Sequence, residues 1–315
     1  MATIPVGAAS LPRVSRAARR SYRVLTDVPS IPLAMLGVLA FAAVFAPVLA
    51  PHGKLTPVKP TAAQCQAKFG MADCPYVDYA PPFWASGGNL DTPLGTDFLG
   101  RDVLSRLMYG ARISLVVALT GTLVAGAIGT LLGVLAGYMG KWWDHIIMRI
   151  TDAWLTLPSL VFAILLSSVR GPGLWNVVLI LALVFWSRYS RAVRGDVLAL
   201  RERDFVKLAE INGIGKLRII RRHLIPNVMN TVMVLFSLQV GVAVIIEASL
   251  SFLGVGVPPP EPSWGLMMAQ ERDSLMEGKW WLAVFPGICI TMLVLSANML
   301  GDWLRVRLDP QLRNR

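Results

Sequence analysis

Long apolar runs without a charge are the feature of this sequence that most restricts its fold. Residues 31–50, 113–140 and 280–300 contain no Asp, Glu, Lys or Arg. A helix needs about 20 apolar residues to cross the hydrocarbon core of a membrane. Charged residues form only 16% of the chain, whereas a soluble domain has about 25%. Membrane-spanning strands would require short alternating segments, which the sequence lacks. We therefore expect an all-α polytopic membrane protein.

Six transmembrane helices are predicted from the apolar runs. The expected spans are residues 31–50, 113–140, 153–169, 174–186, 228–256 and 280–300. The corresponding divisions are a basic segment 1–30, a first span 31–50, a long polar loop 51–112, a five-helix core 113–302 and a short tail 303–315.

The distribution of Lys and Arg predicts how these spans are oriented. With the N-terminus inside, the inside segments include five basic residues in 1–30 and ten in 187–227. The short outside loops have one and two. Because basic residues concentrate in short cytoplasmic loops, both termini and the segment 187–227 are expected to be cytoplasmic. The net charge of +11 is then explained by topology, and we expect no nucleic-acid partner.

The basic stretch 201–226, between the fourth and fifth spans, is the best candidate for function. Phe205, Leu208, Ala209 and Asn212 follow helical spacing and predict a mostly apolar face. Gly213 predicts the end of this helix, since glycine accepts the left-handed conformation of a C-terminal cap. A second short helix would follow and end at Pro226. We expect the apolar face to dock on another protein.

Small and acidic residues within the apolar runs are further candidates. Gly129, Gly133 and Gly137 recur every four residues, which allows two helices to approach closely in a membrane. Their partner is either another subunit or a helix of this chain. Glu247 and Asp152 are acids in or beside spans and are candidates for a translocation path or a subunit interface. The alternative is that each is a structural hydrogen-bond anchor.

Two cysteines share the long polar loop. Cys65 and Cys74 are nine positions apart, and a disulfide is expected if the loop faces an oxidising compartment. The alternative is a pair of free thiols. No His or further Cys is near enough in the sequence to suggest a metal site.

Catalytic motifs are missing from the sequence. A P-loop requires G-x-x-x-x-G-K-[ST], and neither Gly140-Lys141 nor Gly215-Lys216 has the upstream glycine or the following hydroxyl residue. The three histidines are far apart. We expect a non-enzymatic chain without cofactors of its own, which receives energy from a partner or from an ion.

The stretch 201–226 resembles the cytoplasmic "EAA" loop of permease subunits in ABC-type importers. That loop contains Glu-Ala-Ala, a glycine after three residues, and Ile-x-Leu-Pro after nine more. Here Lys207-Leu208-Ala209, Gly213 and the ending at Pro226 have the same spacing. Lys207 and Leu208 replace the acid and the first alanine, and His223 replaces the isoleucine.

Three further stretches resemble the peptide-importing branch of the same family. They are Leu-Gly-Thr-Asp through Gly-Arg-Asp-Val-Leu-Ser-Arg in 94–106, Glu-Ala-Ser-Leu-Ser-Phe-Leu-Gly-Val-Gly-Val in 247–257 with Pro-Ser-Trp-Gly in 262–265, and Leu-Asp-Pro-Gln-Leu-Arg in 308–313. The resemblance runs from about residue 30 to the end of the chain. The cysteine-bearing part, about 52–85, has no counterpart in the pattern.

This resemblance implies partners and roles. A second homologous permease subunit would form a heterodimer with this chain in the lipid bilayer of a bacterial inner membrane. Two cytoplasmic ATPase subunits, which bind ATP and Mg²⁺, would dock on the EAA loops, and an extracytoplasmic binding protein would deliver the substrate. The implied ATPase-coupling residues are Phe205, Lys207, Leu208, Ala209, Asn212, Gly213 and Pro226.

The cargo implied by the resemblance is a di- or oligopeptide. A nickel chelate or an opine would suit the same machine. An ion-driven secondary transporter is a different possibility, and it predicts paired charges or interrupted helices in repeated halves. The sequence has only Glu247 and Asp152 as intramembrane acids and no visible repeat. A structural scaffold would not require the 201–226 stretch.

Overall fold

The computed structural model describes residues 29–59, 62–71, 74 and 76–308, and these residues form a helical bundle without an extended strand. The predicted basic segment 1–30 is almost entirely outside the described residues, as is the second half of the predicted tail 303–315. The first half of that tail continues the last helix as far as Leu308.

Within the described residues, five helices are long and apolar enough to cross a membrane. They are α2 (Ser30–Leu49), α4 (Val103–Met139), α7 (Leu174–Arg201), α10 (Ile225–Phe252) and α13 (Trp281–Leu308). The remaining elements are α3 (Ala62–Phe69), α5 (Lys141–Leu155), α6 (Ser159–Arg170), α8 (Asp204–Ile211), α9 (Lys216–Ile219), the π-helical turn η1 (Ile220–Leu224), α11 (Trp264–Gln270) and α12 (Arg272–Met276). The all-helical membrane fold is confirmed.

The third predicted span, 153–169, is wrong as a single helix. α5 and α6 are joined by a break and bend by 93° relative to each other. Leu157 precedes Pro158, and a residue in that position is disfavoured in helical conformation. α5 also begins at Lys141, twelve residues before the predicted start of this span. The bundle has six crossing segments if the bent pair counts as one span.

The fourth span is much longer than the predicted 174–186. α7 continues through its basic residues to Arg201. Its arginines find acids on the neighbouring α5: Arg194 Nη2 donates to Asp144 Oδ2 at 2.7 Å, and Arg191 pairs with Asp152. Because Asp144 and Asp152 neutralise Arg194 and Arg191, the helix continues past both arginines.

Two other predicted boundaries also move. α4 begins at Val103, ten residues before the expected start of the core, and Asp102 caps it by accepting a 2.8 Å hydrogen bond from Ser105 N. Pro226 does not close the second short helix. It lies in the first turn of α10, where a proline is tolerated because the first N–H groups have no helical acceptor.

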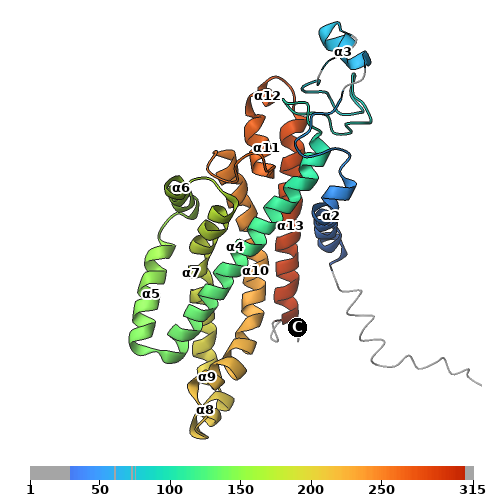
Figure 1. Ribbon diagram of the computed structural model, residues 1–315. Helices are drawn as coiled ribbons and strands as arrows, with labels where there is room; N and C mark the ends of the chain where they lie inside the picture. The colour runs from blue at the N-terminus through green and yellow to red at the C-terminus, as the bar shows by residue number, and fades with distance from the viewer. Residues whose placement is uncertain (1–28, 60–61, 72–73, 75, 309–315) are drawn as a thin grey trace, which may run out of the picture.

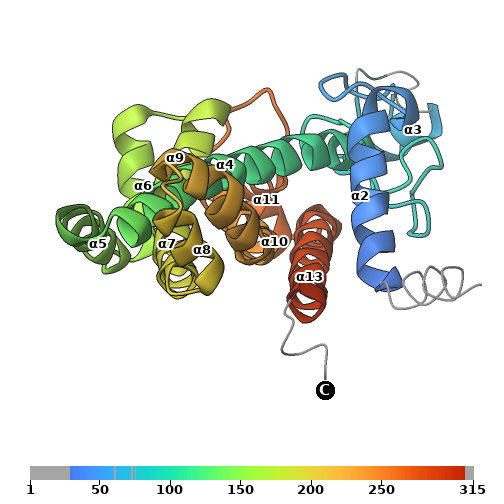
Figure 2. The same cartoon turned by 90° about the horizontal axis from the view of Figure 1, so that it is seen from below.

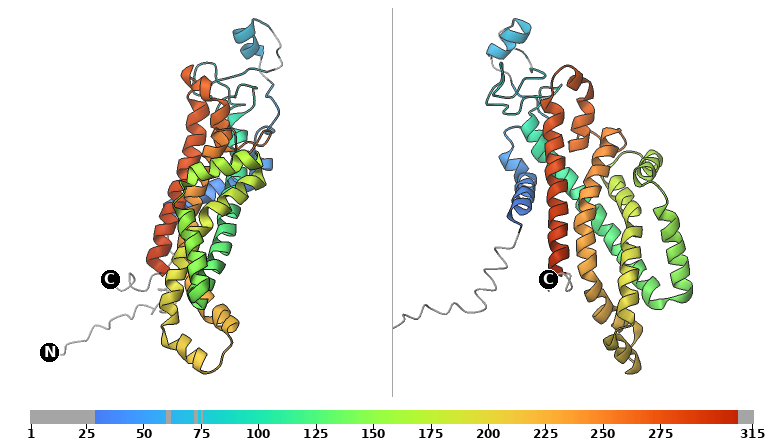
Figure 3. Two further views of the ribbon diagram at one scale, coloured as in Figure 1. Left: turned by 90° about the vertical axis from the view of Figure 1, so that its left-hand side faces the viewer. Right: turned by 180° about the vertical axis from the view of Figure 1, so that it is seen from behind.

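The long helices lie side by side in an elongated row, and shorter helices occupy the two ends, or poles, of the bundle. Figure 1 shows α3 at one pole and α8 with α9 at the other, with α4 running diagonally between them. Seen from below in Figure 2, α5 and α6 lie at one end of the row and α2 at the other. The two views of Figure 3 confirm that α8 and α9 project beyond the ends of the long helices.

The glycine series packs α4 against α7 of the same chain. A Cβ atom on Gly129 would lie 2.3 Å from Trp186 O, one on Gly133 would lie 2.6 Å from Ser190 O, and one on Gly137 would lie 2.8 Å from Val197 Cβ. Of the two alternatives for these glycines, the geometry favours packing against a helix of the same chain. Only glycine permits this approach of the two backbones.

Prediction: Gly129→Ala will lower the stability of the bundle. The new methyl group meets backbone oxygen, which cannot rotate away, and overpacking of this kind costs about 1–3 kcal/mol. The measurement is the thermal unfolding midpoint of the detergent-purified protein. Gly195→Ala is the matched control, because a Cβ atom on Gly195 of α7 would have no packing neighbour within 4 Å, so its midpoint should be unchanged or higher. Equal midpoints for both variants would contradict the close contact.

Candidate functional site

The short helix α8 has one face turned into the protein and one turned out. Val206 and Ala209 are buried, whereas Phe205, Leu208 and Ile211 are 42%, 57% and 80% exposed. The outer residues are three positions apart, so they lie along one side of the helix. Leu217 of α9, 79% exposed, adds to the exposed apolar surface at this pole.

The inner face of α8 is fixed to the ends of the long helices. Val206 and Ala209 join a buried cluster with Val134 and Tyr138 of α4 and Val197 of α7. The Tyr138 hydroxyl also donates a 3.0 Å hydrogen bond to Glu210 Oε1. Ala209 was expected on the docking face, and the structure corrects this by placing its side chain in the cluster.

Gly213 ends α8 in the predicted way. Its φ angle is +71°, in the left-handed region that favours glycine. Gly213 N donates to Glu210 O and Ile214 N donates to Ala209 O, each at 3.0 Å. This pair of bonds is the Schellman motif of a helix C-terminus, and it sets the direction in which the chain leaves α8 for α9.

The polar residues of α8 do not interrupt its exposed apolar face. Lys207 Nζ lies 3.0 Å from Glu202 Oε2, and this hydrogen bond, together with the charge of Lys207, lowers the pKa of the Glu202 carboxyl. Asn212 is exposed and its side chain donates to Leu208 O at 2.8 Å. Ile211 was missed as a docking candidate, although its spacing from Leu208 was a sufficient signal.

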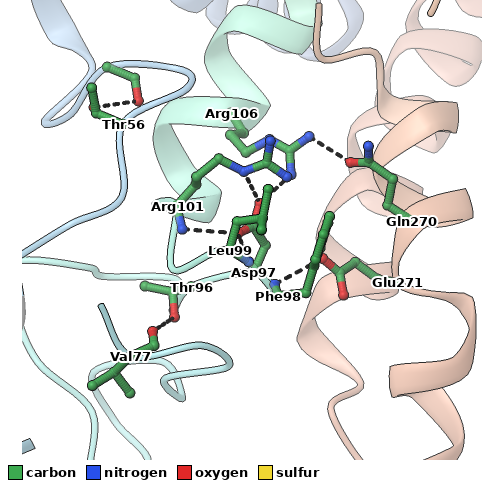
Figure 4. Close-up of polar contacts among 11 residues, drawn as sticks. Thr56, Val77, Thr96, Asp97, Phe98, Leu99, Arg101, Arg106, Gln270 and Glu271 are labelled. Carbon is green, nitrogen blue, oxygen red and sulfur yellow. Dashed lines mark hydrogen bonds and ion pairs between the residues drawn. The ribbon is translucent and has the colours of Figure 1, made fainter. Parts of the chain in front are cut away.

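The opposite pole contains a buried ionic network (Figure 4). Asp97 accepts from Arg101 Nε at 2.7 Å and also pairs with Arg106, while Arg106 Nη2 donates to Gln270 Oε1 at 2.8 Å. Asp97, Arg101 and Arg106 are at most 7% exposed. The network connects the loop before α4 to the first turn of α4 and to the end of α11.

Glu271 joins this network from the segment between α11 and α12. It accepts from Phe98 N at 3.3 Å and from Ser274 Oγ at 3.3 Å. Burial raises the pKa of its carboxyl, and the nearby charge of Asp97 raises it further. Ser274 Oγ also lies 2.8 Å from the Tyr79 hydroxyl. The sequence pattern of 94–106 was noticed, but nothing in it identified Gln270 and Glu271 as its partners.

Glu247 is buried among hydroxyl groups. Its side chain has no exposed surface. It accepts from Ser114 Oγ of α4 at 3.0 Å and from Ser251 Oγ of its own helix at 2.9 Å. The prediction of a path or subunit-interface role is not supported by this position, and the structure agrees with the alternative of a hydrogen-bond anchor.

Asp152 is an exposed residue and not a buried acid. Its side chain is 56% exposed and pairs with Arg191 of α7, which is similarly exposed. The pair links α5 to α7. This pairing agrees with the alternative of a structural anchor for Asp152.

The two cysteines of the long polar loop 51–112 are joined. Cys65 and Cys74 form a disulfide and belong to a small buried cluster with Val77 and Ala80. Thr96 attaches this cluster to the ionic network, because its hydroxyl donates to Val77 O at 2.9 Å and accepts from Ala80 N at 2.8 Å.

These features define a class of protein: a multi-span membrane subunit with a short helix that projects beyond the membrane spans at one pole. The chain belongs to the family of inner membrane components of binding-protein-dependent transport systems, whose model matches residues 129–314. It is thus a multi-pass protein of the bacterial inner membrane.

Relatives and a solved structure agree with this assignment. The chain is 42% identical over 234 residues to the di/tripeptide transport system permease protein DppC of Pseudomonas aeruginosa, covering 74% of this chain and 77% of that one. It is 37% identical over 295 residues to a Brucella suis chain named as a peptide transport system permease, covering 94% and 89%. Its fold is similar to a chain of the inward-facing MetNI methionine ABC transporter, with a TM-score of 0.53, 14% identity and coverage of 65% and 96%.

Prediction: Asp97→Asn will destabilise the outer pole, because it leaves Arg101 and Arg106 buried without an anion. Removal of one partner from a buried ion pair costs about 3–5 kcal/mol. The measurement is the rate of limited proteolysis at the outer loops together with the thermal midpoint. Asp91→Asn is the control, because Asp91 is exposed and, among the residues that the structure describes, it bonds to Asn89 alone. Similar behaviour of the two variants would show that the network adds no stability.

Proposed function

We propose that this chain is the non-catalytic permease subunit of an ATP-driven importer of short peptides. In this proposal it pairs with a second permease subunit, receives its substrate from an extracytoplasmic binding protein, and is driven by two ATPase subunits that bind ATP and Mg²⁺. The observation that carries the proposal is the exposed apolar face of α8, held rigidly at one pole of the bundle.

The geometry of α8 suits the docking of an ATPase. A surface helix normally turns its apolar side inward, yet Phe205, Leu208 and Ile211 are exposed while the inner face is already satisfied by Val206 and Ala209. An apolar strip on a firmly attached helix can fill a groove of a partner, and such helix-in-groove contacts use residues three and four apart. The fixed exit at Gly213 would keep the strip at a constant angle.

The cytoplasmic placement of α8 is supported by charge. α7 delivers the chain to α8, and α10 leaves from the same pole (Figure 1). The bent pair α5–α6 takes the place of the third span, so the alternation of the chain between the two sides is retained. The positive-inside rule then favours a cytoplasmic α8 and an extracytoplasmic disulfide and ionic network.

The choice of peptides as cargo rests on the relatives named above. Those relatives are permeases of a di/tripeptide system and of a peptide system. We accordingly place substrate selection chiefly in the binding protein and passage of the peptide in the permease pair.

Prediction: Leu208→Asp and Phe205→Asp will prevent the ATPase subunits from co-purifying with this chain. Burial of one large apolar side chain is worth about 1.5–3 kcal/mol, and about 1.4 kcal/mol corresponds to a tenfold change in affinity. A loss of about tenfold or more in bound ATPase is expected for each variant, with the chain itself still in the membrane. Leu208→Asp is the cleaner variant because Phe205 also contacts the ring of His223.

Met276→Asp provides the matched control for this experiment. Met276 is 90% exposed on α12, at the pole opposite to α8, so the same chemical change there should leave ATPase binding intact. If Leu208→Asp retains as much ATPase as Met276→Asp, the docking role of α8 is wrong.

Prediction: the complex that co-purifies with this chain will import labelled di- and tripeptides into proteoliposomes when ATP and the binding protein are supplied. Uptake should disappear in the Leu208→Asp complex, since the permease no longer receives energy. The measurement is accumulated label, with excess unlabelled peptide as competitor. Uptake of a nickel chelate or an opine in place of peptide would change the cargo and keep the machine. Uptake without ATP but with an ion gradient would refute the ATP-driven mechanism.

A further inference from the structure

Two adjacent aromatic side chains are exposed on the polar loop that precedes α4. Phe83 and Trp84 are 50% and 51% exposed, and their rings meet edge to face with centroids 5.1 Å apart. Single exposed apolar residues are common on protein surfaces. An edge-to-face pair of large exposed rings is a different case, because an exposed apolar patch usually marks a contact with a partner or a membrane.

The turn that carries this pair has a defined structure. Ala85 N donates to Pro82 O and Gly88 N donates to Ala85 O, each at 2.9 Å, and Phe83 N donates to Pro93 O at 3.2 Å. A Cβ atom on Gly88 would lie 2.1 Å from Pro82 O, so this position requires glycine. The backbone therefore holds the two rings in place from both sides of the turn.

The aromatic pair is continuous with the outer end of a membrane span. The Trp84 ring packs against Phe285 of α13 at 6.2 Å, and Trp280 packs against the same ring at 6.2 Å. Farther along α13, Val284 and Ile288 are 41% and 48% exposed. The exposed surface thus changes from aromatic at the loop to aliphatic along the span.

The residues that lead into α13 also change from charged to apolar. Lys279 immediately precedes Trp280. Its Nζ forms an ion pair with Glu277 Oε2 at 2.6 Å and a cation–π contact with the Tyr79 ring, whose centroid is 3.5 Å away. A path from water into a bilayer meets residue types in the same order: charged residues first, then tryptophan, then aliphatic residues. Trp and Tyr favour the interfacial layer because their rings are apolar and their N–H or O–H groups can bond to water and headgroups.

We propose that Phe83 and Trp84 insert into the interfacial layer of the outer leaflet and anchor the disulfide-bearing loop to the phospholipid bilayer. The partner is the boundary between lipid headgroups and acyl chains. The aromatic pair then adds an attachment to the lipid to those that the loop already has on the protein, such as the ionic network at Asp97. This anchoring requires neither the ATPase partner nor a particular cargo, so it is independent of the proposed function.

Site-directed spin labelling tests this placement. The full-length chain, with Cys289→Ala to remove its free thiol and Trp84→Cys to attach the label, is purified with its accompanying subunits and reconstituted in phosphatidylethanolamine/phosphatidylglycerol vesicles. Collisions with oxygen report lipid, and collisions with a water-soluble nickel chelate report water. Met276→Cys on α12 and Ile288→Cys on α13 are the aqueous and lipid references.

The expected ratio of oxygen to nickel collisions at position 84 lies between those of the two references. A ratio equal to that at position 276 would place the pair in water and overturn the proposal. Low collision rates with both reagents would place it against another protein chain, which also overturns it.

A second measurement covers the case in which the cysteine variant does not fold. Trp84→Phe keeps an aromatic ring, and its fluorescence is compared with that of the unaltered chain in vesicles of brominated phospholipids. Bromine near the glycerol end of the acyl chain should quench a smaller fraction of the emission in Trp84→Phe, whereas bromine near the chain end should show little difference. An unchanged quenched fraction at both depths would refute the lipid contact.

Discussion

The close contact between α4 and α7 is the interaction on which both poles of this protein depend. Gly129, Gly133 and Gly137 bring the two backbones together where any side chain would collide with the opposite helix. In a membrane, lipid tails can cover the apolar surface of a helix as well as another helix can. Helices therefore associate through close packing and not through the hydrophobic effect. α4 carries the ionic network at its start and Tyr138 near its end, and α7 leads directly into α8. The glycine contact therefore fixes the geometry between the two poles.

Buried polar groups elsewhere in the bundle form hydrogen bonds and ion pairs between segments. These bonds fix relative positions that apolar packing alone does not specify. Glu247 connects α10 to α4 through Ser114, and Asp97 connects the outer loop to α4 and, through Arg106, to Gln270. Isolated buried charges are unfavourable, and each of these is met by hydroxyl or guanidinium donors. Their directional bonds specify one arrangement of α4, α10 and α11, a role that is often found for buried polar groups in otherwise apolar interiors. Mutual neutralisation also explains why acids and arginines can occupy the outer ends of the bundle.

The sequence predicted what depends on local pattern and failed where tertiary contacts decide. The helical membrane fold followed from uncharged runs, and the end of α8 followed from Gly213, because both signals are local. The length of α7 was underestimated because Arg191 and Arg194 signal a helix end until their partners on α5 are known. Pro158 was a visible signal for the break between α5 and α6, but the surrounding apolar run concealed it. The period of the glycines identified a packing face without identifying the helix that packs on it. No sequence pattern connects Arg106 with Gln270.

The attachment of α8 suggests how force from an ATPase would reach the outer pole in the proposed assembly. α8 is joined to α7 by the chain itself and to α4 by the bond between Tyr138 and Glu210, so a displacement of α8 acts on both helices together. α4 is a continuous helix of 37 residues, about 55 Å long, and the glycine contact prevents it from sliding independently of α7. A tilt imposed at Tyr138 would therefore be carried to Arg106, whose partners lie on the outer loop and on α11. Closely packed elements respond to such a force by changing between discrete arrangements and not by gradual deformation. The ionic network is consequently where motion of α8 would reach the polar loop and α11, because Arg106 of the rigid α4–α7 pair bonds there to Asp97 and Gln270.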